Sequence, residues 1–180
     1  GVPSRALMQR AGAASAGEIA LRFRDRLHEG VVVLAGPGNN GGDAWVVARA
    51  LAASGVRVRV IEPVPAKTPD CIAERALALD VIDVAHVVTG SVPESIDRGE
   101  AIVIDGLLGT GGRGAVAGIL AEAIGRANAM RERGATVIAL DVPSGVDATT
   151  GAADGVAIVA DLTLTFGTAK RGQLVNRGAC

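Results

Sequence analysis

The sequence predicts a three-layer α/β fold, in which helices cover both faces of a mostly parallel central sheet. Short apolar segments typical of buried strands alternate along the chain with segments of helical periodicity. The strand-like segments that end at residues 35, 105 and 140 each run directly into turn-forming sequence. The length of 180 residues fits one ordinary domain, and we expect a single domain over residues 1–180.

The first third of the chain predicts a helix, a strand, a helix and a second strand. Ser4 is a suitable N-cap for the first helix, and Gly55 is a suitable end for the second. The first strand is a continuous apolar run, and the second alternates Val with Arg. The expected helices are residues 4–27 and 43–54, and the expected strands are residues 31–35 and 56–61, with a glycine-rich turn at 36–42.

The remaining segments continue the alternation. Helical periodicity identifies two further helices, the second of which ends at Gly134. Two apolar runs predict strong buried strands, and a third strand is weaker. The expected helices are residues 70–79 and 117–133, and the expected strands are residues 85–88, 101–105 and 135–140, followed by a hairpin-like region with strands near 156–159 and 162–166.

The bulk composition excludes several classes of protein. The formal net charge is −1, without the basic surplus that nucleic-acid binding requires, so we expect no nucleic-acid partner. The longest apolar runs are far too short to span a bilayer, and no signal-peptide pattern is present, so we expect no membrane partner. Two distant cysteines, Cys71 and Cys180, are typical of a reduced protein, which predicts a cytoplasmic location.

Composition also indicates how a ligand would be held. Aromatic residues are only 2% of the chain, whereas 25 of its 180 residues are glycine. Backbone amides are therefore better suited than aromatic rings to bind a ligand. His28 and His86 lie outside the glycine-rich loops, which argues against a Ser-His-Asp triad. The first loop has no GK[ST] sequence, which argues against P-loop phosphoryl transfer.

Two glycine-rich loops follow predicted strands. GPGNNG at residues 36–41 fits the GxGxxG pattern of dinucleotide-binding loops, and Glu62 follows about twenty residues later. GTGGRG at residues 109–114 fits the same pattern, and its Arg113 is either a phosphate contact or a solvated loop residue. Either loop alone is also compatible with a simple turn, but two at neighbouring strand ends predict a ligand site there.

Polar side chains gather at the same strand ends. Asp43, Asp105 and Asp141 are functional candidates, although Asp43 would also suit a helix N-cap and the other two would suit turn-stabilising contacts. Asn40, Asp105 and Ser144 supply oxygen donors with a single charge among them. Such a set suits a hard cation of low charge, or water, better than zinc.

Three motifs together carry a family resemblance. AGPGNNGGD at residues 35–43, DGLLGTG at 105–111 and DVPSGVD at 141–147 resemble the YjeF amino-terminal domain family, whose enzymatic members are NAD(P)H-hydrate epimerases. The resemblance covers essentially the whole chain. It implies a Rossmann-like three-layer αβα fold with a mostly parallel central sheet. The implied activity is interconversion of the R and S epimers of NADHX and NADPHX, the hydrates of NADH and NADPH, in nicotinamide nucleotide repair.

The resemblance also implies a set of site residues. Asp141 would contact the hydrate, and we expect it to act as the general acid/base at the hydrated C6. A potassium ion would lie at Asn40, Asp105 and Ser144. The two substrate-binding loops would comprise Asn39, Asn40, Gly41, Gly42, Asp43, Gly109, Thr110, Gly111, Gly112, Arg113, Gly114 and Ala115.

Partners follow from the same resemblance. We expect a homodimer that works beside, or is fused to, an NAD(P)H-hydrate dehydratase, and a domain that is trimmed at both ends. The chain departs from the family at Ala44, where Gly is common, and at residues 166–170, where a proline is missing but Lys170 remains.

Two alternative functions remain open at this point. The GxGxxG loop with Glu62 would also suit an NAD(P)-dependent oxidoreductase, although the chain has no tyrosine and no histidine near the loops. Some relatives of the fold act as non-catalytic scaffolds with degenerate loops. The intact Asn, Asp and Ser positions of this chain favour an enzyme.

Overall fold

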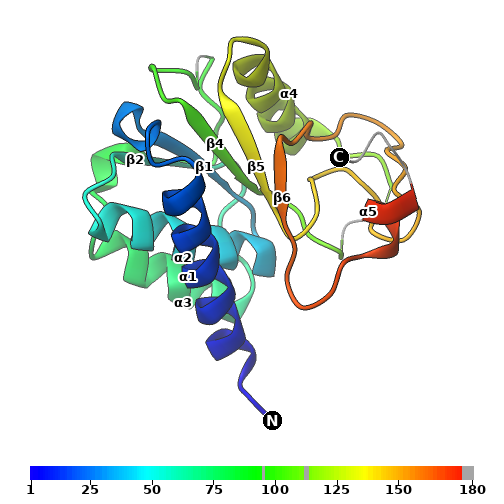
Figure 1. Ribbon diagram of the computed structural model, residues 1–180, viewed down its shortest axis with the longest axis horizontal. Helices are drawn as coiled ribbons and strands as arrows, with labels where there is room; N and C mark the ends of the chain where they lie inside the picture. The colour runs from blue at the N-terminus through cyan, green and yellow to red at the C-terminus, as the bar shows by residue number, and fades with distance from the viewer. Residues whose placement is uncertain (95, 112–113, 176–180) are drawn as a thin grey trace.

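The computed structural model describes residues 1–94, 96–111 and 114–175, and these residues form the predicted three-layer α/β fold around one sheet (Figure 1). All five strand pairings are parallel, in the order β3-β2-β1-β4-β5-β6. The strands are β1 Val31–Ala35, β2 Val58–Glu62, β3 Val87–Thr89, β4 Ile102–Gly106, β5 Thr136–Leu140 and β6 Leu162–Leu164. Chain order reverses between β1 and β4, and in open sheets that reversal marks the place where ligands bind.

Helices cover both faces of this sheet, as Figure 1 shows. Successive strand residues point to opposite faces, which separates the core into two layers. Val33 and Ile104 pack with Trp45 in one layer, and Val32 and Val103 pack in the other. The helices are α1 Ser4–Arg22, α2 Asn39–Ala53 and α3 Pro69–Leu79 on the first face, α4 Gly118–Glu132 on the second, the short α5 Arg171–Val175 beyond β6, and the 3-10 turns Leu27–Glu29 and Val84–His86.

The helices differ from the prediction mainly at their ends. The first helix stops at Arg22 rather than at residue 27, and Pro3, not Ser4, is its N-cap. The second helix begins at Asn39, four residues earlier than its composition predicts. Glycine is a poor helix former in isolation, but packing overrides propensity here, because a Cβ at Gly41 would meet the Gly36 carbonyl oxygen at 1.8 Å.

The expected hairpin near residues 156–166 is wrong. Only β6 forms, and it runs parallel to β5, with Leu162 opposite Ile138. Residues 156–159 are irregular because their donors bind elsewhere: the Ile158 amide donates to the Ser144 carbonyl and the Val159 amide to Asn128 Oδ1.

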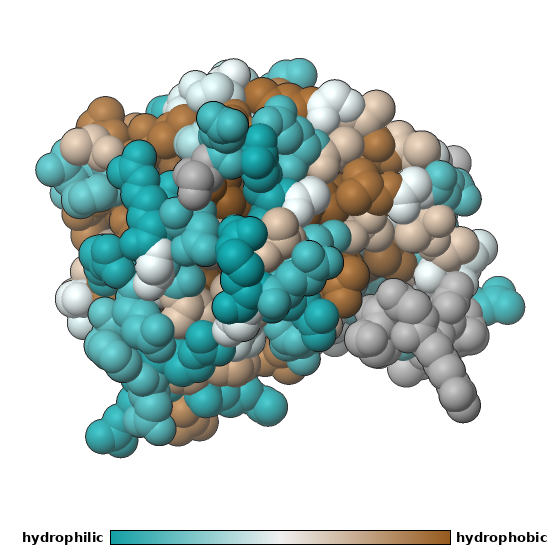
Figure 2. Space-filling view, turned by 90° about the horizontal axis from the view of Figure 1, so that it is seen from above, coloured by the Kyte–Doolittle hydropathy of each residue, from teal (hydrophilic) through white to brown (hydrophobic). Residues whose placement is uncertain are grey.

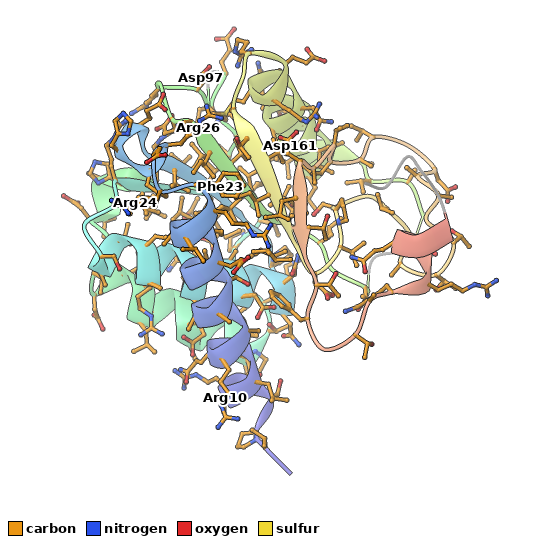
Figure 3. The ribbon with its side chains drawn as sticks, viewed as in Figure 1. Arg10, Phe23, Arg24, Arg26, Asp97 and Asp161 are labelled. Carbon is orange, nitrogen blue, oxygen red and sulfur yellow. The ribbon has the colours of Figure 1, made fainter. Side chains whose placement is uncertain are left out.

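Side chains from other elements brace the amino ends of the strands. Arg26 Nη1 donates to Thr136 Oγ1 at 2.7 Å, and Asp161 Oδ2 accepts the Val137 amide at 2.9 Å. Figure 3 labels Arg26 and Asp161 near this end of the sheet. The view from above shows a mixed surface, hydrophilic over much of its area, with hydrophobic residues along the upper edge and on the right (Figure 2). Over the described ranges, no helix combines the length and apolar character needed to cross a bilayer.

Candidate functional site

The carboxyl ends of β1, β4 and β5 border a cleft of about 500 Å³. It lies at the reversal of strand order, where the sequence places the ligand site. Both glycine-rich loops and the Asp141 turn contribute to it. The lining residues are Pro37, Gly38, Asn39, Asn40, Asp43, Thr68, Leu107, Leu108, Gly109, Thr110, Gly111 and Asp141.

Not every predicted substrate residue lines this cleft. Gly41 and Gly42 are buried in the first turns of α2, behind the surface that Asn39 and Asn40 present. Gly114 and Ala115 line a neighbouring pocket of about 260 Å³ that shares Leu108 and Gly109 with the cleft. The remaining two, Gly112 and Arg113, lie outside the described residues.

Close backbone packing gives the cleft its floor. A Cβ on Gly36 would stand 1.7 Å from the Leu107 carbonyl oxygen, so the loops after β1 and β4 touch through their main chains. A Cβ on Gly38, in contrast, would meet no atom within 4 Å, because this residue lines the open cleft. The Gly38 backbone is therefore accessible to a ligand, as the glycine pattern predicts.

Asp43 points to acid–base chemistry in the cleft. It lies within α2 after Asn39, so it is not the N-cap that we considered as an alternative. Its residue surface is only 9% exposed, and burial, followed by the charge of Asp141, raises the pKa of Asp43 to about 7. A carboxyl with this pKa can exchange a proton near neutral pH.

The raised pKa makes a prediction for stability. The folded-state pKa of about 7 exceeds the ordinary value of 3.8, so between these pH values the folded chain holds a proton that the unfolded chain has released. The wild type should therefore lose stability as pH rises from 4 to 7. Asp43→Asn, which cannot ionise, should be more stable than wild type at pH 8 by a few kcal/mol, at about 1.4 kcal/mol per pKa unit, and similar at pH 4.

Urea unfolding at both pH values measures the difference, with the exposed Asp25→Asn as the matched control. An Asp43→Asn variant that is less stable than wild type at pH 8 would contradict the burial argument.

Asp141 occupies an unusual backbone conformation at the end of β5. Of the residues that the structure describes, it is the one non-glycine residue in the left-handed region, with φ 65°. Its Oδ1 accepts a hydrogen bond from Lys170 Nζ at 2.5 Å and one from the Phe166 amide at 3.3 Å. Both charged side chains are largely buried, at 14% exposure for Asp141 and 19% for Lys170.

Lys170 is the site residue whose role sequence reasoning missed. Its Nζ also donates to the Phe166 carbonyl at 2.7 Å, so the ammonium is fixed beside the carboxylate. The segment after β6 carries it back to the end of β5, a contact that neither periodicity nor a motif reveals. Two signals in the sequence point to it: Lys170 remains in the family stretch at residues 166–170, and lysine is scarce, with only two among 18 basic residues.

Asn40, Asp105 and Ser144 do come together, in a buried cluster beneath the cleft. Asp105 is fully buried and accepts hydrogen bonds from the Ser144 amide, Ser144 Oγ and the Leu107 amide at 2.8, 2.6 and 3.1 Å. Burial raises the pKa of Asp105 to about 6, against the opposing effect of these hydrogen bonds. Within the described part of the chain, no cationic side chain pairs with it.

The same cluster holds an unpartnered oxygen. Asn40 Nδ2 donates to the Leu108 and Leu140 carbonyls at 2.8 and 3.1 Å, whereas Asn40 Oδ1 is buried without a hydrogen-bond partner. The Leu108 amide in turn donates to Ser144 Oγ at 2.9 Å. Hydrogen bonds to Leu108 therefore connect the segments that follow β1, β4 and β5, which contain Asn40, Leu108 and Ser144.

Glu62 does not serve the cleft. Its carboxylate is completely buried and accepts hydrogen bonds from the Ala66 amide, Arg75 Nε and Thr89 Oγ1. A ribose hydroxyl cannot reach a carboxylate that is enclosed in this way. Glu62 is therefore wrong as a ribose-binding residue, and the oxidoreductase alternative loses the acidic residue on which it rested.

Comparisons with known proteins agree with this geometry. The family model described as "YjeF-related protein N-terminus" matches residues 4–172. A "Bifunctional NAD(P)H-hydrate repair enzyme Nnr" from Thermanaerovibrio acidaminovorans is 39% identical, and the match covers 97% of this chain and 34% of that protein. An "NAD(P)H-hydrate epimerase" from Limosilactobacillus fermentum is 34% identical, and the match covers 99% of this chain and 82% of that protein.

A solved structure shares the fold. The yeast protein YNL200c superimposes with a TM-score of 0.82 at 21% identity, over 99% of this chain and 77% of that one. The chain spans about a third of the length of the bifunctional relatives that it matches. Because the family model spans nearly all of the described residues and the epimerase relative aligns over most of its own length, the chain belongs to the YjeF-related N-terminal family.

Proposed function

We propose that this protein is an isomerase, an NAD(P)H-hydrate epimerase that interconverts the R and S epimers of NADHX and NADPHX. One observation carries the proposal: Asp43 and Asp141 line a single cleft in different electrostatic environments, since Asp43 is buried and Asp141 is paired with the Lys170 ammonium. Pairs of carboxyl groups with different environments divide the roles of acid and base. The names of the relatives, one of them an NAD(P)H-hydrate epimerase, supply the substrate.

The chemistry needs one base and one acid. In a hydrated nicotinamide ring, C6 carries both a hydroxyl group and the ring nitrogen. Asp141 takes the hydroxyl proton, the carbonyl forms, and the C6–N1 bond breaks while Asp43 protonates N1. Rotation about the C5–C6 bond turns the carbonyl, and the reverse steps close the ring on its other face. No atom or electron is gained or lost, and each carboxyl recovers its starting protonation state.

Lys170 supports the base in this scheme. Its ammonium lies 2.5 Å from Asp141 Oδ1 and holds this carboxyl group in place at the edge of the cleft. The exposed backbone of Gly38 and of Gly109–Gly111 would take the diphosphate, because these residues line the cleft and Gly38 and Gly111 have open space beside their backbones.

The buried cluster suits a potassium ion. The orphaned Asn40 Oδ1 and the unpaired charge of Asp105 are the two groups that a monovalent cation would satisfy, with Ser144 as a third donor. These three side chains are oxygen donors with a single charge among them, which fits a cation of low charge. The ion would supply one positive charge that orders the loops.

Potassium should therefore stabilise the protein. We expect the melting temperature to be a few degrees higher in potassium chloride than in choline chloride of equal concentration. Ligand stabilisation of about 1–3 kcal/mol moves the melting temperature by about 2–4 °C per kcal/mol in a domain of this size. Asp105→Asn should abolish the difference, whereas Asp25→Asn should keep it. Identical melting of the wild type in the two salts would remove potassium from the proposal.

An epimerisation assay tests the function directly. The protein is incubated with one purified epimer of NADHX, and chromatography follows the appearance of the other epimer. The wild type should reach the equilibrium mixture much faster than the buffer control. If the protein binds the hydrate without accelerating epimerisation, the family's non-catalytic scaffold role becomes the better description; if it oxidises or reduces the ligand, the oxidoreductase alternative returns.

The wider setting of the reaction is also proposed. We place this chain beside, or fused to, a dehydratase that consumes one epimer, which is consistent with relatives that are called bifunctional and are about three times as long. The expected homodimer and the cytoplasmic location stay predictions.

A further inference from the structure

We propose that Gln173 is a positioning residue, which holds both Asp141 and Lys170 in the arrangement that epimerisation needs. This inference rests on the proposed function for its catalytic consequence, but not for its structural content. Gln173 lies in α5, beyond the edge strand β6, and is not among the residues that line the cleft. Neither the family motifs nor the glycine pattern includes it.

One amide group links three points around the candidate base. Gln173 Nε2 donates to the Asp141 carbonyl at 2.8 Å and to Thr165 Oγ1 at 2.7 Å. Gln173 Oε1 accepts the Lys170 amide at 2.8 Å. A primary amide has two donor hydrogens and one carbonyl oxygen, and all of these are engaged here.

The hydrogen bond from Gln173 Nε2 to the Asp141 carbonyl fixes the backbone of Asp141, the proposed base. Asp141 has φ 65°, a conformation that persists in a non-glycine residue only where its surroundings hold it. The Asp141 amide donates to the Leu164 carbonyl, and the Asp141 carbonyl accepts from Gln173 Nε2 and, at 3.3 Å, from Thr165 Oγ1. Gln173 therefore supplies the shorter of the two hydrogen bonds that orient this carbonyl.

The second contact fixes the counter-ion. Lys170 lies in the irregular segment between β6 and α5, and its ammonium bonds to Asp141 Oδ1 and to the Phe166 carbonyl. Gln173 Oε1 anchors the main chain of Lys170, so the base and its positive partner are set by the same side chain. Displacing one of them displaces the other.

This arrangement predicts a specific kinetic signature. Because Gln173 does not line the cleft, its loss should leave substrate binding nearly unchanged while it misplaces the base. Small displacements of a catalytic group can cost about 100-fold in rate. Gln173→Met, which keeps the length but removes the hydrogen bonds of the side chain, should lower kcat by about 10- to 100-fold and change KM less than about twofold.

The matched control is Gln9→Met. Gln9 is also an amide side chain in a long-range hydrogen bond, to Glu74 at 2.7 Å, but it lies on α1 and does not line the cleft. Gln173→Glu is the second variant, since it keeps the acceptor for the Lys170 amide and loses the donor to the Asp141 carbonyl. It should retain the fold if the Met variant does not, and its kcat should fall with little change in KM.

A readout that is independent of activity accompanies the kinetics. Amide resonances and the HN–Hα coupling of Asp141, measured by NMR, report its left-handed backbone. We expect both to change in the Gln173 variants and to stay as in wild type in Gln9→Met. If the wild type does not epimerise the hydrate but these signals move, the proposed function fails and the positioning role stands. If the signals stay unchanged, or if KM rises with kcat intact, the positioning role is wrong.

Discussion

Asp141→Asn should lower the rate of epimerisation by about 100- to 10,000-fold, the range of a lost general acid–base group. Asparagine matches aspartate in size and is among the few residues that tolerate the left-handed backbone found at this position. The change therefore removes the carboxylate and its ion pair with Lys170, and it keeps the turn. Binding of the hydrate should remain measurable, because the backbone of both glycine-rich loops is untouched.

The measurement is the initial rate of epimer interconversion, with calorimetry of hydrate binding alongside it. Asp25→Asn serves as the control, since this exposed aspartate lies in the turn before β1, at the opposite end of the sheet. Wild-type turnover in Asp141→Asn would eliminate Asp141 as the catalytic base.

Gly36→Ala should destabilise the protein by about 3 kcal/mol or more, at the upper end of overpacking effects. The added Cβ would stand 1.7 Å from the Leu107 carbonyl oxygen, and only a shift of main chain could relieve that clash. Gly41→Ala should behave in the same way, because its Cβ would stand 1.8 Å from the Gly36 carbonyl oxygen. Gly36→Ala pushes the loop after β1 away from the loop after β4, and Gly41→Ala distorts the turn that leads from Gly36 into α2. Hydrate binding should therefore fall together with stability.

Gly38→Ala is the matched control for these variants, in the same loop. Nothing lies within 4 Å of its added Cβ, and its φ of −98° suits alanine. Its free energy of unfolding, from urea denaturation, should stay within about 0.5 kcal/mol of the wild type. Gly36→Ala with wild-type stability would show that the two loops do not pack as described.

The order of strands and helices from α1 to β5 could be predicted from the sequence, because most of these elements carry a strong local signal. Continuous apolar runs such as Val31–Ala35 become strands buried on both faces. The start of α2 could not be predicted, because Gly41 and Gly42 are helical only where close packing excludes a side chain. The 156–159 segment looked like a strand, but its amides bind a loop and α4 rather than a neighbouring strand.

The part of the candidate site that lies in the loops directly after the strands could be predicted from the sequence. Asn40, Asp43, Asp105, Asp141 and Ser144 were each found from their position at a strand end or from the family motifs. The contacts made by the segment after β6 could not be predicted. The parallel pairing of β6 with β5 returns that segment to the cleft, and the sequence does not reveal this pairing. Glu62 is kept from a ligand by its burial, and the sequence contains no sign that Arg75 and Thr89 enclose its carboxylate.

The crossing of hydrogen bonds at Leu108 has a thermodynamic consequence. Its carbonyl accepts from Asn40 Nδ2 and its amide donates to Ser144 Oγ, so the loop that lines the substrate cleft is bonded directly to the buried cluster. Any ligand that orders one side lowers the entropic cost of ordering the other. By linkage, the factor by which a cation improves nucleotide affinity must equal the factor by which the nucleotide improves cation affinity. The cleft and the cluster beneath it would then bind cooperatively, because Asn40 and Leu108 belong to both.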